Sequence, residues 1–257
     1  MSHAALITGA SRGIGRGVAV ALAGAGFDVA LTARSADALG ETATAAREAG
    51  AATAVALPAD AGDMEAMRSV AHDAARALGR APDVLVHCAG IARNGPSAQL
   101  SLGDFEESQR VNVTAAFVLA QELAPAMVEG GWGRIVTIGS LYSRFGVAQT
   151  AAYTSTKHAV LGLTRVLAAE YVRKGITANC IVPGFVDTEM VRDEVAKAAT
   201  ARGTSEEEIL TKFLRIQPIG RMVTTQELGA LVAFLCSDAA APITGQAINI
   251  DGGAHQA

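Results

Sequence analysis

Three polar residues in the middle of the chain have the types and spacing needed to exchange a proton with a substrate oxygen. Tyr153 and Lys157 stand four positions apart at the start of a predicted helix, so their side chains share one face of it. A lysine ammonium lowers the pKa of a neighbouring tyrosine and makes it usable as a general acid and base. Ser140 follows a predicted strand and can donate a hydrogen bond to a substrate oxygen. The trio predicts interconversion of a ketone and a secondary alcohol, with the hydride carried by a cofactor.

A glycine-rich turn near the N-terminus predicts the cofactor site. Residues 8–15 read TGASRGIG and lie between a predicted strand and a predicted helix. Gly9 allows the tight turn, Gly13 lets the backbone approach a pyrophosphate, and Gly15 lets the helix pack closely on the strand. The free N–H groups at the helix N-terminus attract phosphate. The alternative is that Tyr153 packs in the core and Lys157 is solvated. The presence of the glycine turn upstream argues against this alternative.

The residues after the second predicted strand indicate which dinucleotide binds. NAD-binding proteins of this fold usually carry an acidic residue there, which bonds the adenosine ribose and repels a 2′-phosphate. This chain has Ala33 and then Arg34, with no acid before Asp37. The guanidinium of Arg34, together with that of Arg12 in the glycine turn, can form charge-assisted hydrogen bonds with a phosphate. The pattern favours NADP(H), with NAD(H) as the alternative.

Short apolar runs alternate with longer helical patterns and predict an α/β fold. Strands are predicted at residues 4–8, 28–32, 54–57, 83–87, 134–138, 177–182 and 247–250. Helices are predicted at residues 13–25, 36–49, 64–78, 105–128, 152–173 and 225–236. Strands rich in Val, Ile and Leu are typical of a parallel sheet buried on both faces. We therefore expect one domain, residues 1–257, with a doubly wound, Rossmann-like sheet of about seven strands.

One long segment, residues 184–220, breaks the alternation of strands and helices. It is polar and predicted to be helical at 193–200 and 206–214. We interpret it as a lid over the substrate; a helical hairpin on the surface is the alternative.

Composition limits the classes of partner. The chain has 257 residues, of which half are hydrophobic, and a net charge of −4 without a long block of one sign, which argues against nucleic acid or an anionic membrane as partner. Cys88, Cys180 and Cys236 show neither metal-ligand spacing nor a disulfide framework, so we expect reduced thiols and no metal. No signal peptide and no apolar stretch long enough to span a bilayer is predicted. The expected location is the cytoplasm.

Taken in order, the turn at residues 8–15, Ser140, Tyr153 and Lys157 resemble the motifs of the short-chain dehydrogenase/reductase family, along essentially the whole chain. The resemblance implies that Asn112 holds a water in a proton relay and that Lys157 also bonds the nicotinamide ribose. It further implies a homotetramer, because residues 251–253 match a motif often found near a subunit interface.

The resemblance also completes the expected cofactor site. The segment after the sixth strand would orient the nicotinamide, and Asp60 would contact the adenine. The residues expected to bind the cofactor are Gly9, Ser11, Arg12, Gly13, Ile14, Gly15, Arg34, Asp60, Ala89, Gly90, Tyr153, Lys157, Pro183, Gly184, Val186 and Thr188.

The chain departs from the family after the fourth strand. The family's Asn-Asn-Ala-Gly is HCAG here, at residues 87–90. The small Ala89–Gly90 pair, which lets the cofactor approach, is kept, whereas the hydrogen bonds of the two asparagines are in doubt. We interpret His87 as a buried, hydrogen-bonded sheet residue rather than a catalytic one.

The substrate is the least specified feature. Residues 215–221 and 243–246 resemble bacterial 3-oxoacyl and polyketide ketoreductases, and the lid at 204–208 is closer to 3-hydroxybutyrate dehydrogenases. Residues 129–132 read EGGW and lack the basic side chains that an acidic carrier protein would need. A CoA-linked or small 3-oxo compound is therefore favoured. The alternatives are an NAD-dependent 3-hydroxybutyrate-type or other secondary alcohol dehydrogenase and a non-catalytic dinucleotide sensor, a class that commonly loses the tyrosine or lysine.

Overall fold

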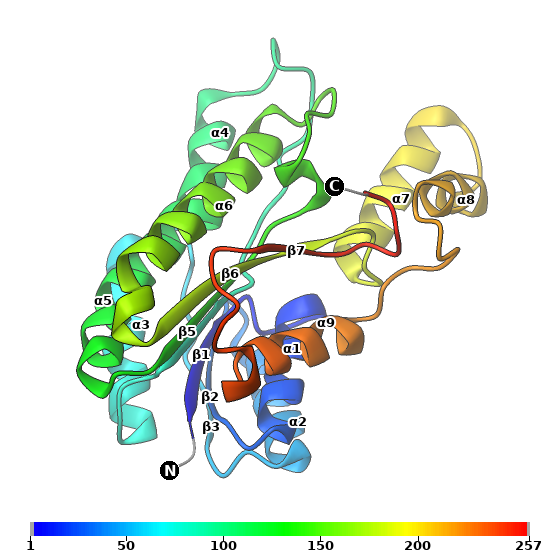
Figure 1. The fold of residues 1–257 in the computed structure, drawn as a ribbon. Helices are drawn as coiled ribbons and strands as arrows, with labels where there is room; N and C mark the ends of the chain where they lie inside the picture. Colours follow the sequence, from blue (N-terminus) through cyan, green and yellow to red (C-terminus); the bar gives the residue numbers. More distant parts are fainter. Residues whose placement is uncertain (1–2, 256–257) are drawn as a thin grey trace.

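A single parallel sheet with helices on both faces organises the protein (Figure 1). The computed structural model describes residues 3–255. The strands lie in the order β3-β2-β1-β4-β5-β6-β7, and every neighbouring pair is parallel. Their bounds are Ala4–Thr8 (β1), Asp28–Thr32 (β2), Ala54–Ala56 (β3), Val84–His87 (β4), Gly133–Ile138 (β5), Ile176–Pro183 (β6) and Ala247–Ile250 (β7). The predicted doubly wound fold is confirmed.

The helices connect the strands as crossovers. The α-helices are Gly13–Gly24 (α1), Ala36–Ala49 (α2), Met64–Leu78 (α3), Leu102–Gln109 (α4), Ala115–Gly130 (α5), Ala151–Tyr171 (α6), Glu189–Arg202 (α7), Glu206–Ile216 (α8) and Thr225–Leu235 (α9). A π-helical segment, Arg110–Thr114 (η1), and short 3-10 turns at Leu141–Ser143 (η2), Val172–Lys174 (η3) and Asp238–Ala240 (η4) complete the set. Ends differ from the predicted ones by a few residues, because helix and strand ends depend on local capping.

Alternation along the strands divides the core between the two faces of the sheet. In β1, Ile7 packs with α1, α2 and α9, whereas its neighbour Leu6 packs with α3 and α5. Successive strand side chains point to opposite faces, so each face needs its own helical layer. Burial on both faces explains why these strands read as continuous apolar runs.

The longest helical run, Leu102–Gly130, corrects one expectation. It comprises α4, η1 and α5 without a break, and it is long and apolar enough, by length and composition, to cross a bilayer. The prediction that no apolar stretch is long enough to span a bilayer was wrong. More than half of its most apolar window, 56%, is buried inside the protein, where α5 packs on α3 and β5. A core helix of a sheet-based fold accounts for this apolar character.

The segment predicted as a lid forms two helices beside the sheet (Figure 1). α7 and α8 share a small apolar cluster of their own, with Val195, Ala199 and Ile209 buried. α7 begins earlier than predicted, at Glu189, because the hydroxyl of Thr188 accepts the N–H of Val191 and caps the helix. The prediction of two helices in this segment is confirmed.

Candidate active site

The predicted catalytic residues meet at the carboxyl edge of the sheet. Ser140 lies just beyond the end of β5, and Tyr153 and Lys157 lie on the first two turns of α6, which packs beside β5 and β6. Asn112 reaches the same region from η1. The carboxyl ends of parallel strands are where ligands bind in this class of fold.

The ammonium of Lys157 is buried and held by the sheet. Its Nζ donates a hydrogen bond of 2.7 Å to the carbonyl of Ile138, at the end of β5. It lies 5.4 Å from the centre of the Tyr153 ring. Burial lowers the pKa of Lys157 to about 8. The side chain is thus close to the tyrosine, but over its ring.

The pKa of Tyr153 moves opposite to the predicted direction. Burial raises it to about 12, and a hydrogen bond from the Ser140 side chain only partly opposes this rise. The expectation that Lys157 lowers this pKa was wrong for this arrangement, because Nζ is engaged by Ile138 and desolvation of the phenolate dominates. Tyr153 is therefore a protonated phenol at neutral pH, the form that can donate a proton.

Ser140 is oriented by the turn that it caps. Its backbone is extended, and its Oγ accepts the N–H of Tyr142 at 3.2 Å. The Ser143 Oγ in return accepts the N–H of Ser140. The turn uses only the acceptor side of Oγ, so the Ser140 O–H proton can be donated to Tyr153 or to a substrate carbonyl.

Asn112 is buried and hydrogen-bonded to protein groups through both ends of its amide. Its Oδ1 accepts the N–H of Ile91 at 2.8 Å, and its Nδ2 donates to the Ile91 carbonyl and to the Thr156 hydroxyl, both at 2.9 Å. It therefore ties η1 to the segment after β4 and to the α6 residue next to Lys157. A π-helical turn, which often marks a functional site, places it there.

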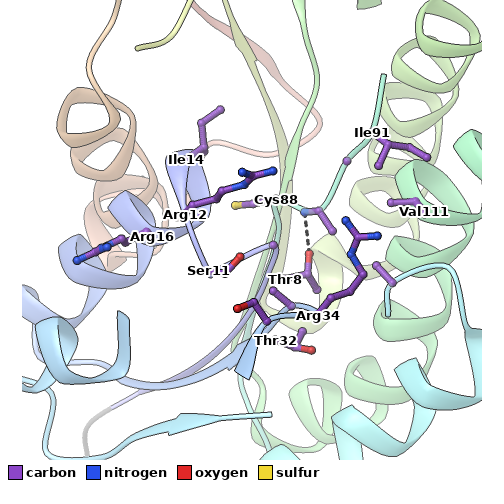
Figure 2. Close-up of a pocket in the computed structure, with 18 of the residues that line it drawn as sticks. Thr8, Ser11, Arg12, Ile14, Arg16, Thr32, Arg34, Cys88, Ile91 and Val111 are labelled. Carbon is purple, nitrogen blue, oxygen red and sulfur yellow. Dashed lines mark hydrogen bonds between the residues drawn. The ribbon is translucent and has the colours of Figure 1, made fainter. Parts of the chain in front are cut away.

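A cavity of about 600 Å³ is lined by the glycine turn, by residues after β2 and β4, and by the start of α7. Figure 2 shows part of its wall, including Arg12 and Arg34. α1 begins there with no side-chain cap and no acidic residue in its first turn, so its N–H groups and positive end face the cavity unopposed. Gly9 has φ +62°, and a Cβ on it would stand 2.8 Å from the nitrogen of Ala89. A Cβ on Gly15 would stand 2.2 Å from the carbonyl oxygen of Gly9. The turn therefore has no space for side chains at these positions, as predicted.

Most of the predicted cofactor residues line this cavity. They are Gly9, Ser11, Arg12, Gly13, Ile14, Gly15, Arg34, Asp60, Ala89, Gly90 and Thr188. Gly90 joins the cavity to the catalytic residues, since a Cβ on it would lie 3.7 Å from Nζ of Lys157. The residues present thus fit a dinucleotide.

Five predicted contacts, Tyr153, Lys157, Pro183, Gly184 and Val186, are not among the residues that line the cavity. The last three belong to the end of β6 and the segment after it. Pro183 ends β6 and is buried, Gly184 packs against the Gln217 side chain, and Val186 is buried and bridges to Val223. They shape the segment that carries Thr188.

Arg12 and Arg34 reach the cavity from different elements (Figure 2). Arg34 is exposed just after β2. Arg12 forms an ion pair with Glu189, the first residue of α7. Ala33 also lines the cavity, at the place where NAD-binding relatives of this fold carry a carboxylate.

Sequence reasoning missed two cavity-lining residues at the start of α7 and a buried residue that holds the segment before it. Glu189 and Met190 line the cavity, and Gln217 is completely buried. Gln217 accepts the N–H of Phe185 at 2.8 Å, and Phe185 stacks on Phe213 of α8 at 4.6 Å. Only the fold brings these residues together, because each pair is separated by about thirty positions or more along the chain. Among residues 3–255, no group of three or more His, Cys, Asp or Glu side chains is placed to hold a metal ion.

Known proteins share this arrangement over their full length. The family described as enoyl-(acyl carrier protein) reductase matches residues 9–255. The chain belongs to the short-chain dehydrogenase/reductase family. Like the other members, it is an oxidoreductase acting on secondary alcohols or ketones.

Individual relatives of this short-chain dehydrogenase/reductase are similar from end to end. A 3-oxoacyl-[acyl-carrier-protein] reductase from Aquifex aeolicus is 34% identical, over 96% of this chain and 95% of the relative. A D-beta-hydroxybutyrate dehydrogenase from Cupriavidus necator is 35% identical, over 97% and 96%. The crystal structure of an actinorhodin polyketide ketoreductase variant with NADPH superposes with a TM-score of 0.93 at 34% identity, covering 98% of this chain and 97% of that one.

Proposed function

We propose that this enzyme is an NADP(H)-dependent ketoreductase whose substrate is a 3-oxoacyl-type compound, either CoA-linked or small. The observation that carries the proposal is the placement of Ser140, Tyr153 and Lys157 at the carboxyl edge of the sheet, next to a cavity that Arg34 lines but these three residues do not. Gly90, which lies beside both Lys157 and Asn112, is the link between the two.

The nicotinamide cofactor, when bound, supplies or accepts the hydride. During reduction, the Ser140 hydroxyl donates a hydrogen bond to the substrate carbonyl and stabilises the negative charge growing on its oxygen. Tyr153, protonated because burial raises its pKa to about 12, donates the proton that completes the alcohol. Lys157, held at Ile138, bonds the cofactor ribose and keeps a positive charge close to the phenolate that forms. Asn112 lies on the route by which that proton is replaced.

The charge at the adenosine end of the cavity supports NADP(H). Arg34 has a flexible, exposed guanidinium there, and Ala33 leaves no carboxylate to repel a 2′-phosphate. The ketoreductase structure that this chain resembles contains NADPH. NAD(H) remains the alternative cofactor.

The substrate class rests on the relatives and on surface charge. A 3-oxoacyl reductase and a D-beta-hydroxybutyrate dehydrogenase, which both handle an oxygen at carbon 3, are similar over their full lengths. Glu129 lies just before β5, where a basic patch would favour an acidic carrier protein. A CoA thioester or a free 3-oxo acid therefore suits this surface better than a carrier-bound chain.

The test is a matrix of substrates and cofactors. We expect NADPH oxidation with acetoacetyl-CoA or acetoacetate to exceed NADH oxidation, and to exceed reduction of a simple ketone. Faster turnover of 3-hydroxybutyrate with NAD would favour the dehydrogenase alternative. Cofactor binding without turnover of any ketone would favour the non-catalytic sensor.

We also propose a homotetramer in the cytoplasm, with 184–220 acting as the lid of a single domain. Two large apolar side chains, Phe117 on α5 and Val166 on α6, are about half exposed and suit burial against another subunit. Light scattering after gel filtration gives the subunit number directly.

A further inference from the structure

His87, which stands where the family carries an asparagine, connects the cofactor cavity to the Asn112 turn. Its side chain is buried at the end of β4. On one side, Nδ1 lies 3.0 Å from the hydroxyl of Thr8. On the other side, Nε2 lies 3.2 Å from the carbonyl of Val111 in η1. One ring therefore touches both the end of β1 and the π-helical turn.

The direction of each hydrogen bond in this series is determined by the groups at the two ends of the series. Burial lowers the pKa of His87 to about 4, so the ring is neutral and carries one proton. The Val111 carbonyl can only accept, so Nε2 donates to it and Nδ1 must accept from the Thr8 hydroxyl. The Thr8 oxygen in turn accepts the N–H of Ala89 at 3.0 Å (Figure 2). The hydrogen bonds therefore run from Ala89 to Thr8, from Thr8 to His87 and from His87 to Val111, and each of them joins one donor to one acceptor.

Each end of this series of hydrogen bonds reaches a different part of the site. Thr8 and Ala89 line the cavity, so the Nδ1 side holds part of the surface that faces a bound cofactor. Val111 precedes Asn112, which bonds Ile91 and the Thr156 hydroxyl beside Lys157. The Nε2 side therefore holds the turn that aligns Asn112 with the catalytic helix.

We propose that His87 is a positioning residue with two separable roles: through Thr8 it shapes the cofactor surface, and through Val111 it places Asn112 for turnover. The inference rests on the proposed function for its turnover part only. An amide can replace one side of the ring at a time. The amide atoms of asparagine lie about as far from Cβ as Nδ1 of histidine does. The amide atoms of glutamine lie about as far from Cβ as Nε2 does.

The test compares His87→Asn with His87→Gln. His87→Asn keeps an acceptor for Thr8 and loses the donor to Val111, so kcat should fall about 3- to 10-fold while the dissociation constant of NADPH changes less than about 2-fold. His87→Gln keeps the donor to Val111 and loses the acceptor, so NADPH binding should weaken by about 3- to 10-fold with kcat nearly retained. Binding is followed by NADPH fluorescence and needs no substrate.

Two further variants keep the result interpretable. Thr8→Val, which leaves His87 in place, should weaken NADPH binding as much as His87→Gln does, and the double variant should add less than about 2-fold because both remove one interaction. Thr164→Val is the matched control: it removes a buried hydroxyl pair of 2.8 Å with Thr137, between α6 and β5, and should lower only the melting temperature.

The outcomes distinguish this inference from the proposed function. Equal losses of affinity and kcat in His87→Asn and His87→Gln, or losses in Thr8→Val and His87→Gln that simply add, would overturn the positioning role. If wild-type protein reduces no ketone, the proposed function fails, and the two-variant comparison of NADPH affinity still decides the role of His87 at the cavity.

Discussion

The guanidinium of Arg12 in the glycine turn forms an ion pair with the carboxylate of Glu189, the first residue of α7. The two residues are 177 positions apart in the chain. Both line the cavity, and both side chains are more than 60% exposed. The pair thus joins the glycine turn to the first residue of α7, within the segment predicted as a lid, and its exposure makes it weak and readily exchanged.

Removing the carboxylate should release Arg12 for a phosphate. We expect Glu189→Gln to tighten NADPH binding by about 2- to 5-fold, the range of an exposed ion pair, and to leave NADH binding unchanged. Asp193→Asn, four positions further along α7, is the control for a general change of charge. Equal tightening of both cofactors would show that Arg12 does not meet the 2′-phosphate.

Arg34 should select between the two cofactors. Arg34→Ala removes a charge-assisted contact at the adenosine end and is expected to weaken NADPH binding by about 10- to 100-fold, with little effect on NADH. Adding Ala33→Asp should reverse the preference, because the new carboxylate repels a 2′-phosphate. Titrations of both cofactors against the three proteins measure this, and parallel losses would identify Arg34 as a solvated bystander.

Tyr153→Phe should abolish turnover and keep the cofactor. Phenylalanine keeps the packing of the ring, including its edge-on contact with Tyr142, in which the two ring centres are 5.9 Å apart. Only the proton donor is lost. The expected loss in kcat is about 10²–10⁴-fold, with an NADPH dissociation constant within about 2-fold of wild type. A variant that kept a third or more of the wild-type rate would rule out this role.

The buried ammonium of Lys157 should make stability depend on pH. Its folded pKa is about 8, below the ordinary value of 10.5. Between these two values the unfolded chain binds a proton that the folded protein does not, so the free energy of unfolding rises with pH across this window, by about 3 kcal/mol in order of magnitude.

Lys157→Met lacks this group and should lose that rise. Urea unfolding of both proteins at several pH values from 7.5 to 10.5 gives the comparison. Curves that stay parallel across the window would show that Lys157 titrates as an exposed lysine does. The same variant should also weaken NADPH binding, since it removes the proposed ribose contact.

Closure of the lid should protect α7 and α8 from protease. These helices carry tryptic sites at Arg192, Lys197, Arg202, Lys212 and Arg215. We expect cleavage there to slow when NADPH and a 3-oxo substrate are added to Tyr153→Phe, which binds without turnover. Unchanged cleavage at saturating ligand would favour a surface hairpin.

Local patterns in the sequence were sufficient for the order of elements and for placing the predicted site residues at one edge of the sheet. The period of the apolar residues separates strands from helices, and a parallel sheet brings strand ends together whatever the details of packing. For that reason the turn at residues 8–15, Ser140, Tyr153 and Lys157 could be placed near one cavity before any coordinates were known. The helix predicted at residues 105–128 is part of the longer run Leu102–Gly130, whose exact ends and π-helical turn the apolar period did not indicate.

Electrostatics and cross-chain contacts were decided by the tertiary structure alone. Whether burial or Lys157 controls the pKa of Tyr153 depends on where Nζ finds a partner, and that partner is a carbonyl of β5. The bonds from His87 to Thr8 and Val111 span 79 and 24 positions, and no local pattern encodes them. Sequence periodicity reports on which face of an element is buried, whereas desolvation and hydrogen bonding depend on distances of a few ångströms between elements, which only the packed sheet and helices define.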